Sequence, residues 1–166
     1  ETELEAAQRK VAELEDEDNP SYDEIAVALD ALTELFAQEG QFKEALITAE
    51  RSLAIREESL DSNHPDVALS LNNVGVMLVQ LNRYKQARPI LERALSARKK
   101  ELGNLHPEVG QAVNNLAFLL KEIGDYESAK ALFEEALHIW ETSSGKDSLD
   151  TGYAVNNLGL VHAALG

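Results

Sequence analysis

Apolar side chains recur along this chain every three or four residues, the spacing that places them on one face of an α-helix. The clearest stretch follows His64-Pro65-Asp66. Its apolar positions are Val67, Leu71, Val74, Leu78 and Leu81. Proline is well tolerated at the first helical position, and a carboxylate is favourable at the positive helix N-terminus. The pattern therefore predicts a helix that begins in this His-Pro-Asp segment.

A second helix is predicted directly after the first. Asn82 ends the first pattern, at a place where Gly or Asn accommodates the left-handed conformation that terminates a helix. A new apolar stripe follows from about Tyr84, again at helical spacing. It consists of Ala87, Leu91, Ala94 and Leu95. The two helices are expected to form an antiparallel pair.

The two-helix unit recurs with a period of 42 residues. Asn72-Asn73 reappears as Asn114-Asn115 and as Asn156-Asn157. In the same register, His64-Pro65 reappears as His106-Pro107. Repetition at periods of about 20 to 50 residues is typical of solenoids, in which each unit packs on its neighbours.

The register predicts one all-α solenoid domain over residues 1–166. Residues 1–18 match only a second helix, and residues 147–166 match only a first helix. The three complete helix pairs are expected at 19–62, 63–104 and 105–146. We therefore expect eight helices, stacked as antiparallel pairs in a right-handed superhelix.

The first helices resemble those of the tetratricopeptide repeat family. The family spacing W-x2-L-G-x2-Y is matched in form by Leu71-x2-Val74-Gly75-x2-Leu78 and by the equivalent residues of the next two repeats. The 42-residue unit, with phrases such as His106-Pro107-Glu108-Val109, is similar to the repeats of kinesin light chains and related adaptors. The resemblance implies a scaffold without enzymatic activity, which presents a concave groove to another protein.

The face opposite the apolar stripe of each first helix is expected to line this groove. The residues predicted to bind a peptide there are Asn72, Asn73, Val76, Gln111, Asn114, Asn115, Phe118, Lys121, Tyr153, Asn156, Asn157 and Leu160. The same stripe includes Asp30, Glu34, Gln38, Leu69, Val79, Gln80 and Glu122. The groove is thus expected to combine amides, apolar patches and an acidic end.

Six asparagines within helices require a reason, because asparagine is a mediocre helix former. In the resembled family, groove asparagines hold the backbone of an extended peptide. An amide offers both a donor and an acceptor, so it can pair with any peptide unit. The alternative is that these asparagines bond to neighbouring helices and only hold the stack together. One member of each pair could serve each role.

Other repeated polar residues are interpreted as structural. His64 and His106 precede helix starts and are expected to cap them. The repeated arginines of the second helices are expected to form surface ion pairs, which are individually weak: Arg51, Arg56, Arg93 and Arg98. No phosphate loop, nucleophile motif or paired-histidine metal motif occurs, so no catalytic residue, metal or cofactor is predicted.

Composition narrows the choice of partners. The chain has no cysteine and a net charge of −15, with 30 acidic and 15 basic residues. That charge argues against nucleic acid, because phosphate binding depends on Lys and Arg. No apolar run approaches the roughly 18 residues of a membrane helix. We expect a cytoplasmic protein with a protein or peptide partner and no membrane association.

The leading functional hypothesis is a protein–protein interaction scaffold that binds a peptide segment in its groove. Two alternatives stay open: a structural or assembly module, and a regulatory domain of a larger signalling protein. Residues 147–166 lack a second helix to cover Val155 and Leu158. Because terminal repeats of solenoids usually carry a polar cap, this uncapped helix is also a candidate for homo-oligomer formation.

Overall fold

The computed structural model describes residues 2–166; Glu1, the first residue of the segment predicted at 1–18, lies outside the described residues. Within them the chain forms eight α-helices and no strand. The helices are α1 (Glu3–Glu15), α2 (Tyr22–Gln38), α3 (Phe42–Ser59), α4 (Pro65–Gln80), α5 (Tyr84–Leu102), α6 (Pro107–Glu122), α7 (Tyr126–Ser143) and α8 (Leu149–Leu165). The all-α prediction is confirmed.

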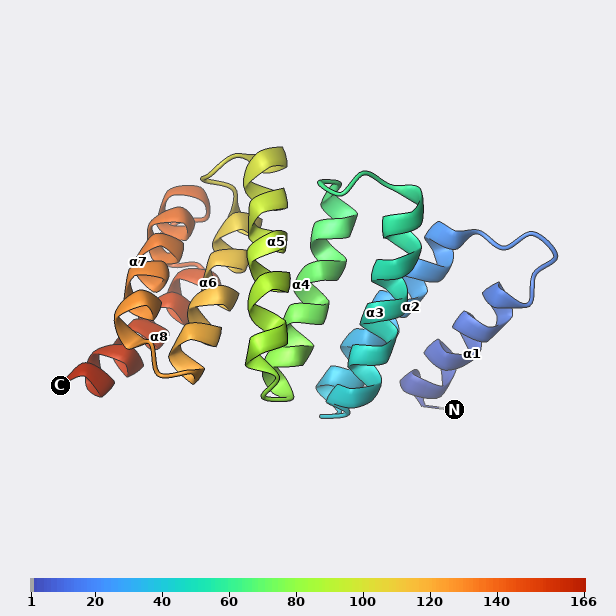
Figure 1. Ribbon diagram of the computed structural model, residues 1–166, viewed down its shortest axis with the longest axis horizontal. Coiled ribbons are helices and arrows are strands. Elements are labelled where there is room, and N and C mark those ends of the chain that lie inside the picture. The colour runs from blue at the N-terminus through green and yellow to red at the C-terminus, as the bar shows by residue number, and fades with distance from the viewer. Residues whose placement is uncertain (1) are drawn as a thin grey trace.

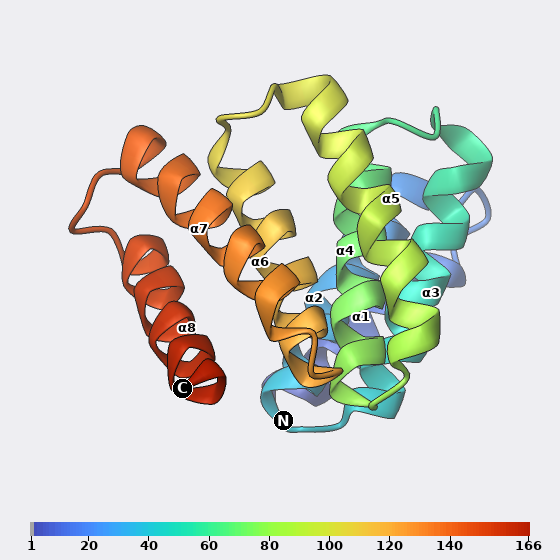
Figure 2. The same cartoon turned by 60° about the vertical axis from the view of Figure 1, so that its left-hand side comes forward.

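The helices stack as antiparallel pairs in a right-handed superhelix, with the two chain ends at opposite ends of the stack (Figure 1). Helix α2 packs on α3, α4 on α5 and α6 on α7. Successive first helices also contact one another, α2 with α4, α4 with α6 and α6 with α8. Figure 2 shows α8 at the free edge of the stack, beyond α7. The division into repeats at the expected boundaries stays a prediction.

The helix ends follow from capping residues that the sequence displays. Nδ1 of His64 accepts a hydrogen bond from the backbone N–H of Asp66 at 3.2 Å, and Nδ1 of His106 accepts one from Glu108 at 3.3 Å. Asn82 has a φ of 58°, and the glycines one repeat before and one repeat after it have φ values of 75° and 85°. The predicted histidine caps and left-handed turns are confirmed.

A core of branched and small side chains fills the space between the helices. Leu71 of α4, Leu119 of α6 and Phe133 of α7 are completely buried. The second helices contribute small side chains that are also completely buried: Ala45, Ala87, Ala129 and Ala136. Such close packing lets each pair bury its apolar faces without large voids.

Gly110 marks a very close contact between α6 and α7. A β-carbon at Gly110 would lie 2.6 Å from Nε1 of Trp140. The indole cannot easily retreat, because it is 3% exposed and donates a hydrogen bond to the carbonyl of Pro107 at 3.0 Å. We expect Gly110→Ala to destabilise the fold by about 1–3 kcal/mol, since overpacking here outweighs the helix propensity of alanine.

Gly152 provides a matched control for this substitution. It stands one repeat after Gly110, and a β-carbon there would meet nothing within 4 Å. Gly152→Ala should therefore stabilise the protein by up to about 1 kcal/mol through helix propensity alone. Urea unfolding of both variants measures the difference, and equal effects would contradict the packing argument.

Candidate functional site

The first helices α2, α4 and α6 surround two adjoining hollows on their shared face. The larger has a volume of about 630 Å³ and is lined by residues of these three helices. The smaller has a volume of about 210 Å³ and lies between α4, α5 and α6. Because Val76 and Asn115 line both, we treat the two hollows as one and call it the α2–α6 groove.

Seven of the twelve residues predicted to bind a peptide line this groove. They are Asn72, Asn73, Val76, Gln111, Asn114, Asn115 and Phe118. Asp30, Glu34, Leu69, Val79 and Gln80 of the predicted stripe also line it. The sequence did not indicate five further lining residues, four on the first helices and one, Leu91, on α5: Ala31, Thr33, Ala37, Met77 and Leu91.

The asparagine pairs form hydrogen bonds from one first helix to the next. Nδ2 of Asn115 donates to Oδ1 of Asn72 at 2.8 Å, and Nδ2 of Asn157 donates to Oδ1 of Asn114 at 3.2 Å. These bonds tie α6 to α4 and α8 to α6, as the structural alternative requires. In each bond one amide donates an N–H and the other accepts through its oxygen. Nδ2 of Asn72 and Asn114, and Oδ1 of Asn115 and Asn157, therefore have no hydrogen-bond partner within residues 2–166.

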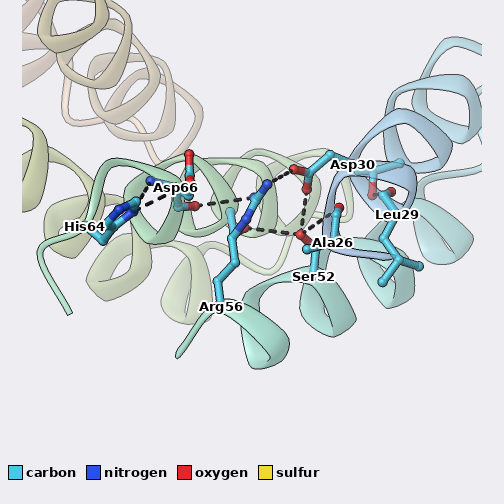
Figure 3. A network of polar contacts seen from close by, with 9 residues as sticks. Ala26, Leu29, Asp30, Ser52, Arg56, His64 and Asp66 are labelled. Carbon is cyan, nitrogen blue, oxygen red and sulfur yellow. Dashed lines mark hydrogen bonds and ion pairs between the residues drawn. The ribbon is translucent and has the colours of Figure 1, made fainter. Parts of the chain in front are cut away.

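Two of the four arginines expected in surface ion pairs are buried instead, so that prediction is wrong for them. Arg56 is 5% exposed and Arg98 is 2% exposed. Nη2 of Arg56 lies 2.6 Å from Oδ2 of Asp30, and its Nη1 lies 2.6 Å from Oγ of Ser70. Figure 3 shows this buried network, in which the guanidinium of Arg56 is bonded toward Asp30.

The other two arginines form the expected exposed pairs. Arg51 pairs with Glu15, and Arg93 pairs with Glu57. Both pairs link successive second helices. Helical spacing placed all four arginines on the second helices, but it did not reveal that two of the long side chains lie beneath a neighbouring helix.

Arg98 occupies the register position of Arg56 one repeat later, but its surroundings differ. Asn72 stands in place of Asp30, and Ala112 stands in place of Ser70. The exchange removes both the carboxylate and the hydroxyl that neutralise and bond the first guanidinium.

The hydrogen bonds of Arg98 are correspondingly incomplete. Its Nη1 donates to the carbonyl of Glu108 at 2.9 Å and to Oε1 of Gln111 at 3.3 Å. Its Nε is buried and has no hydrogen-bond partner among residues 2–166, and the exposed carboxylate of Glu108 lies 3.8 Å from it. Burial lowers the pKa of Arg98 because it disfavours the charged guanidinium, and the Glu108 carboxylate opposes that shift.

Comparison with known proteins identifies the repeat. The sequence profile of the tetratricopeptide repeat matches residues 24–100 and 108–166. This chain belongs to the tetratricopeptide repeat (TPR) family. A search of curated proteins finds no match.

Solved structures support the same TPR fold. BtubC (BKLC) from P. vanneervenii has a TM-score of 0.84 and 23% identity over 98% of this chain, which spans 65% of that protein. A kinesin light chain-like protein of P. anserina with nearly identical TPR-like repeats has a TM-score of 0.79 and 21% identity, with 98% of this chain and 77% of that one covered. The resemblance to kinesin light chain repeats is confirmed.

A third TPR structure contains a ligand. The first TPR of Spaghetti (RPAP3), bound to the HSP90 peptide SRMEEVD, has a TM-score of 0.61 and 16% identity, with 84% of this chain and 92% of that one covered. At such identities, these three likenesses show the fold alone.

The remaining predicted groove residues lie outside the two hollows of this TPR chain. Nζ of Lys121 lies 3.0 Å from the carboxylate of Glu122 and 4.2 Å from the ring centre of Phe118, so its charge is engaged within α6. The others belong to α8: Tyr153, Asn156, Asn157 and Leu160. They extend the face beyond the groove rather than line it.

Helix α8 leaves much of its apolar surface uncovered. Tyr153 is 63% exposed, Val155 54% and Leu160 53%. Self-association of the TPR chain through this surface stays a prediction.

Residues 2–166 contain no group of three His, Cys, Asp or Glu side chains placed to hold a metal ion. In the same range, every helix is too short or too polar to span a lipid bilayer.

Proposed function

We propose that this TPR chain is a protein–protein interaction scaffold that binds an extended peptide segment of a partner in the α2–α6 groove. The bond between Asn115 and Asn72 carries the proposal. It leaves Nδ2 of Asn72 as a donor and Oδ1 of Asn115 as an acceptor, both on residues that line the groove. A peptide unit offers one carbonyl and one N–H, so this pair of groups is complementary to a peptide backbone.

Apolar groups beside the amides support the same proposal. Val76 and Phe118 are half-buried and line the groove next to Asn115. Side chains of an extended peptide would cover them, and this adds apolar burial to the backbone hydrogen bonds. The Spaghetti TPR, bound to a peptide, shows that a related fold accommodates this class of ligand.

We also infer that the chain is a binding module rather than an enzyme, without a cofactor, and that it does not bind nucleic acid or membranes. The net charge of −15 supports the last point, since phosphate groups are repelled.

Substitution of Asn73 and of Asn115 by alanine distinguishes a binding role of the asparagines from a structural role. Asn73 lines the groove and makes no side-chain hydrogen bond within residues 2–166, whereas Asn115 bonds to Asn72. Asn73→Ala should weaken binding of a peptide selected by display by about 1–3 kcal/mol, with stability nearly unchanged. Asn115→Ala should lower both binding and stability.

Calorimetric titration with the selected peptide and urea unfolding of each variant provide the two measurements. If Asn73→Ala binds normally while Asn115→Ala only unfolds more easily, the asparagines are structural and the binding proposal is wrong.

The alternative function is an assembly module. The exposed apolar surface of α8 favours it, because such a patch is costly in water unless another surface covers it. Light scattering over a concentration series tests this alternative, since a strict monomer at high concentration would contradict it.

A further inference from the structure

One register position of the first helices forms different hydrogen bonds along the stack. It holds Asp30 in α2, Asn72 in α4 and Asn114 in α6. Asn72 accepts a hydrogen bond from Asn115 of the first helix that follows, and the two residues are 43 positions apart. Asn114 accepts one from Asn157 at the same spacing. We call these contacts the asparagine bonds.

The asparagine bond between α2 and α4 is missing. By the same spacing of 43 positions, the donor to Asp30 would be Asn73, and both residues line the larger hollow. The side chain of Asn73 nevertheless makes no hydrogen bond within residues 2–166. Because this side chain is half-buried at the wall of the groove, its donor and its acceptor are both available there.

The carboxylate of Asp30 is bonded to the second helix instead. Its Oδ2 lies 2.6 Å from Nη2 of Arg56, and its Oδ1 accepts a hydrogen bond from Ser52 at 2.7 Å (Figure 3). Helix α3 thus engages both oxygens. A charge-assisted hydrogen bond is about twice as strong as one between neutral groups, so a carboxylate at this position pairs with the arginine rather than with an asparagine.

The second helix pair shows that an arginine without the carboxylate does not have this effect. Arg98 stands at the register position of Arg56, but its Nη1 donates to the carbonyl of Glu108 rather than to Asn72. Asn72 stays bonded to Asn115. The carboxylate and its arginine together therefore determine whether the asparagine of the next first helix is bonded or available.

We propose that the ion pair between Asp30 and Arg56 keeps Asn73 available as a backbone-binding position of the groove. Arg56 is then a positioning residue, because it is buried and acts through Asp30. This inference rests on the peptide-binding function proposed above and identifies where the peptide backbone is held. A free asparagine amide can pair with both the N–H and the C=O of one residue of an extended peptide, since these two groups point to the same side.

The shape of the groove agrees with this assignment. The larger hollow, with a volume of about 630 Å³, extends from α4 to α2 across the place of the missing bond. The smaller hollow, with a volume of about 210 Å³, lies where Asn115 is bonded to Asn72. A peptide therefore has more room beside Asn73 than beside the closed asparagine bond.

Two double variants test the proposal, and both remove the ion pair. Asp30→Asn with Arg56→Met offers an amide oxygen to Asn73, so the missing bond should form. Asp30→Leu with Arg56→Met offers no acceptor, so Asn73 should stay available. Asparagine and leucine are similar in size and the two variants have the same net charge, so each is the control for the other.

The probe is the tightest binder from a library of random twelve-residue peptides displayed against residues 1–166. In calorimetric titration, the Asp30→Asn double variant should bind it about two- to tenfold more weakly than the Asp30→Leu double variant, because the new bond takes one N–H of Asn73. Adding Asn73→Ala should cost more affinity in the Asp30→Leu background than in the other. An ion pair that only stabilises the fold predicts equal affinities.

A second measurement needs no peptide. The side-chain amide signals of Asn73, assigned by their loss in Asn73→Ala, report on its hydrogen bond in NMR spectra of the isotope-labelled protein. Their exchange with water should be fast in the wild type and in the Asp30→Leu double variant, and slower in the Asp30→Asn double variant. Slow exchange in the wild type would show that Asn73 is already bonded, and this result does not depend on the folding of any variant.

The outcomes separate this inference from the scaffold function. Recovery of no binding peptide from the library would remove both. Equal affinity of the two double variants for the peptide, or a bonded Asn73 amide in the wild type, would overturn the role of the ion pair and leave the scaffold function standing.

Discussion

Asp30→Ala is expected to destabilise the protein by about 3–5 kcal/mol, because it leaves the guanidinium of Arg56 buried without its counter-ion. The side chain of Arg56 is 6% exposed and that of Asp30 is 17% exposed, so water replaces the lost carboxylate poorly. Asp30 also accepts a hydrogen bond from Ser52 at 2.7 Å, which is lost at the same time. Urea unfolding followed by circular dichroism measures the loss.

Two further variants show whether the loss comes from the unpaired charge. Combining Asp30→Leu with Arg56→Met removes both charges and should recover most of the stability, since apolar residues of similar size replace a buried ion pair at little cost. Glu15→Ala breaks the exposed pair with Arg51 and should cost less than about 1 kcal/mol. Equal losses from the buried and the exposed pair would contradict the argument.

The helices and their order were predictable because the local signals agree with the packing. Helix α4 starts where His64 and Pro65 indicate a start, and it ends before the left-handed turn at Asn82. The apolar period of each helix gave its core face, and the opposite face of the first helices could then be assigned to a groove. These features depend on neighbours within one or two helical turns.

The polar details of the groove were not predictable because they depend on residues from other repeats. Asn72 was expected to be accessible along the stripe, but it is 5% exposed, and an asparagine 43 residues later donates to it. The difference between Arg56 and Arg98 arises from the residue 26 positions earlier, which is Asp30 in one case and Asn72 in the other. The 42-residue register identifies these positions, but the contact that links them requires the packed helices.

In the third helix pair, α6 and α7, the uncharged residue Trp140 replaces the buried arginine of the first two pairs. It stands at the register position of Arg56 and Arg98, and its indole is 3% exposed. The ring packs in a cluster that includes Val109, Val113 and Ala154, and it donates to the carbonyl of Pro107 at 3.0 Å. An apolar ring with one donor thus fills a place that the other repeats give to a guanidinium.

Trp140→Ala should cost about 3–5 kcal/mol in urea unfolding, because it opens a large cavity between α6 and α7. Trp140→Phe keeps most of the ring but loses the hydrogen bond, so it should cost about 1–2 kcal/mol. Because Ala154 of α8 belongs to the same cluster, the alanine variant should also speed amide hydrogen exchange in α8 more than in α2. Unchanged exchange in α8 would show that this helix is held by other contacts, such as the bond between Asn157 and Asn114.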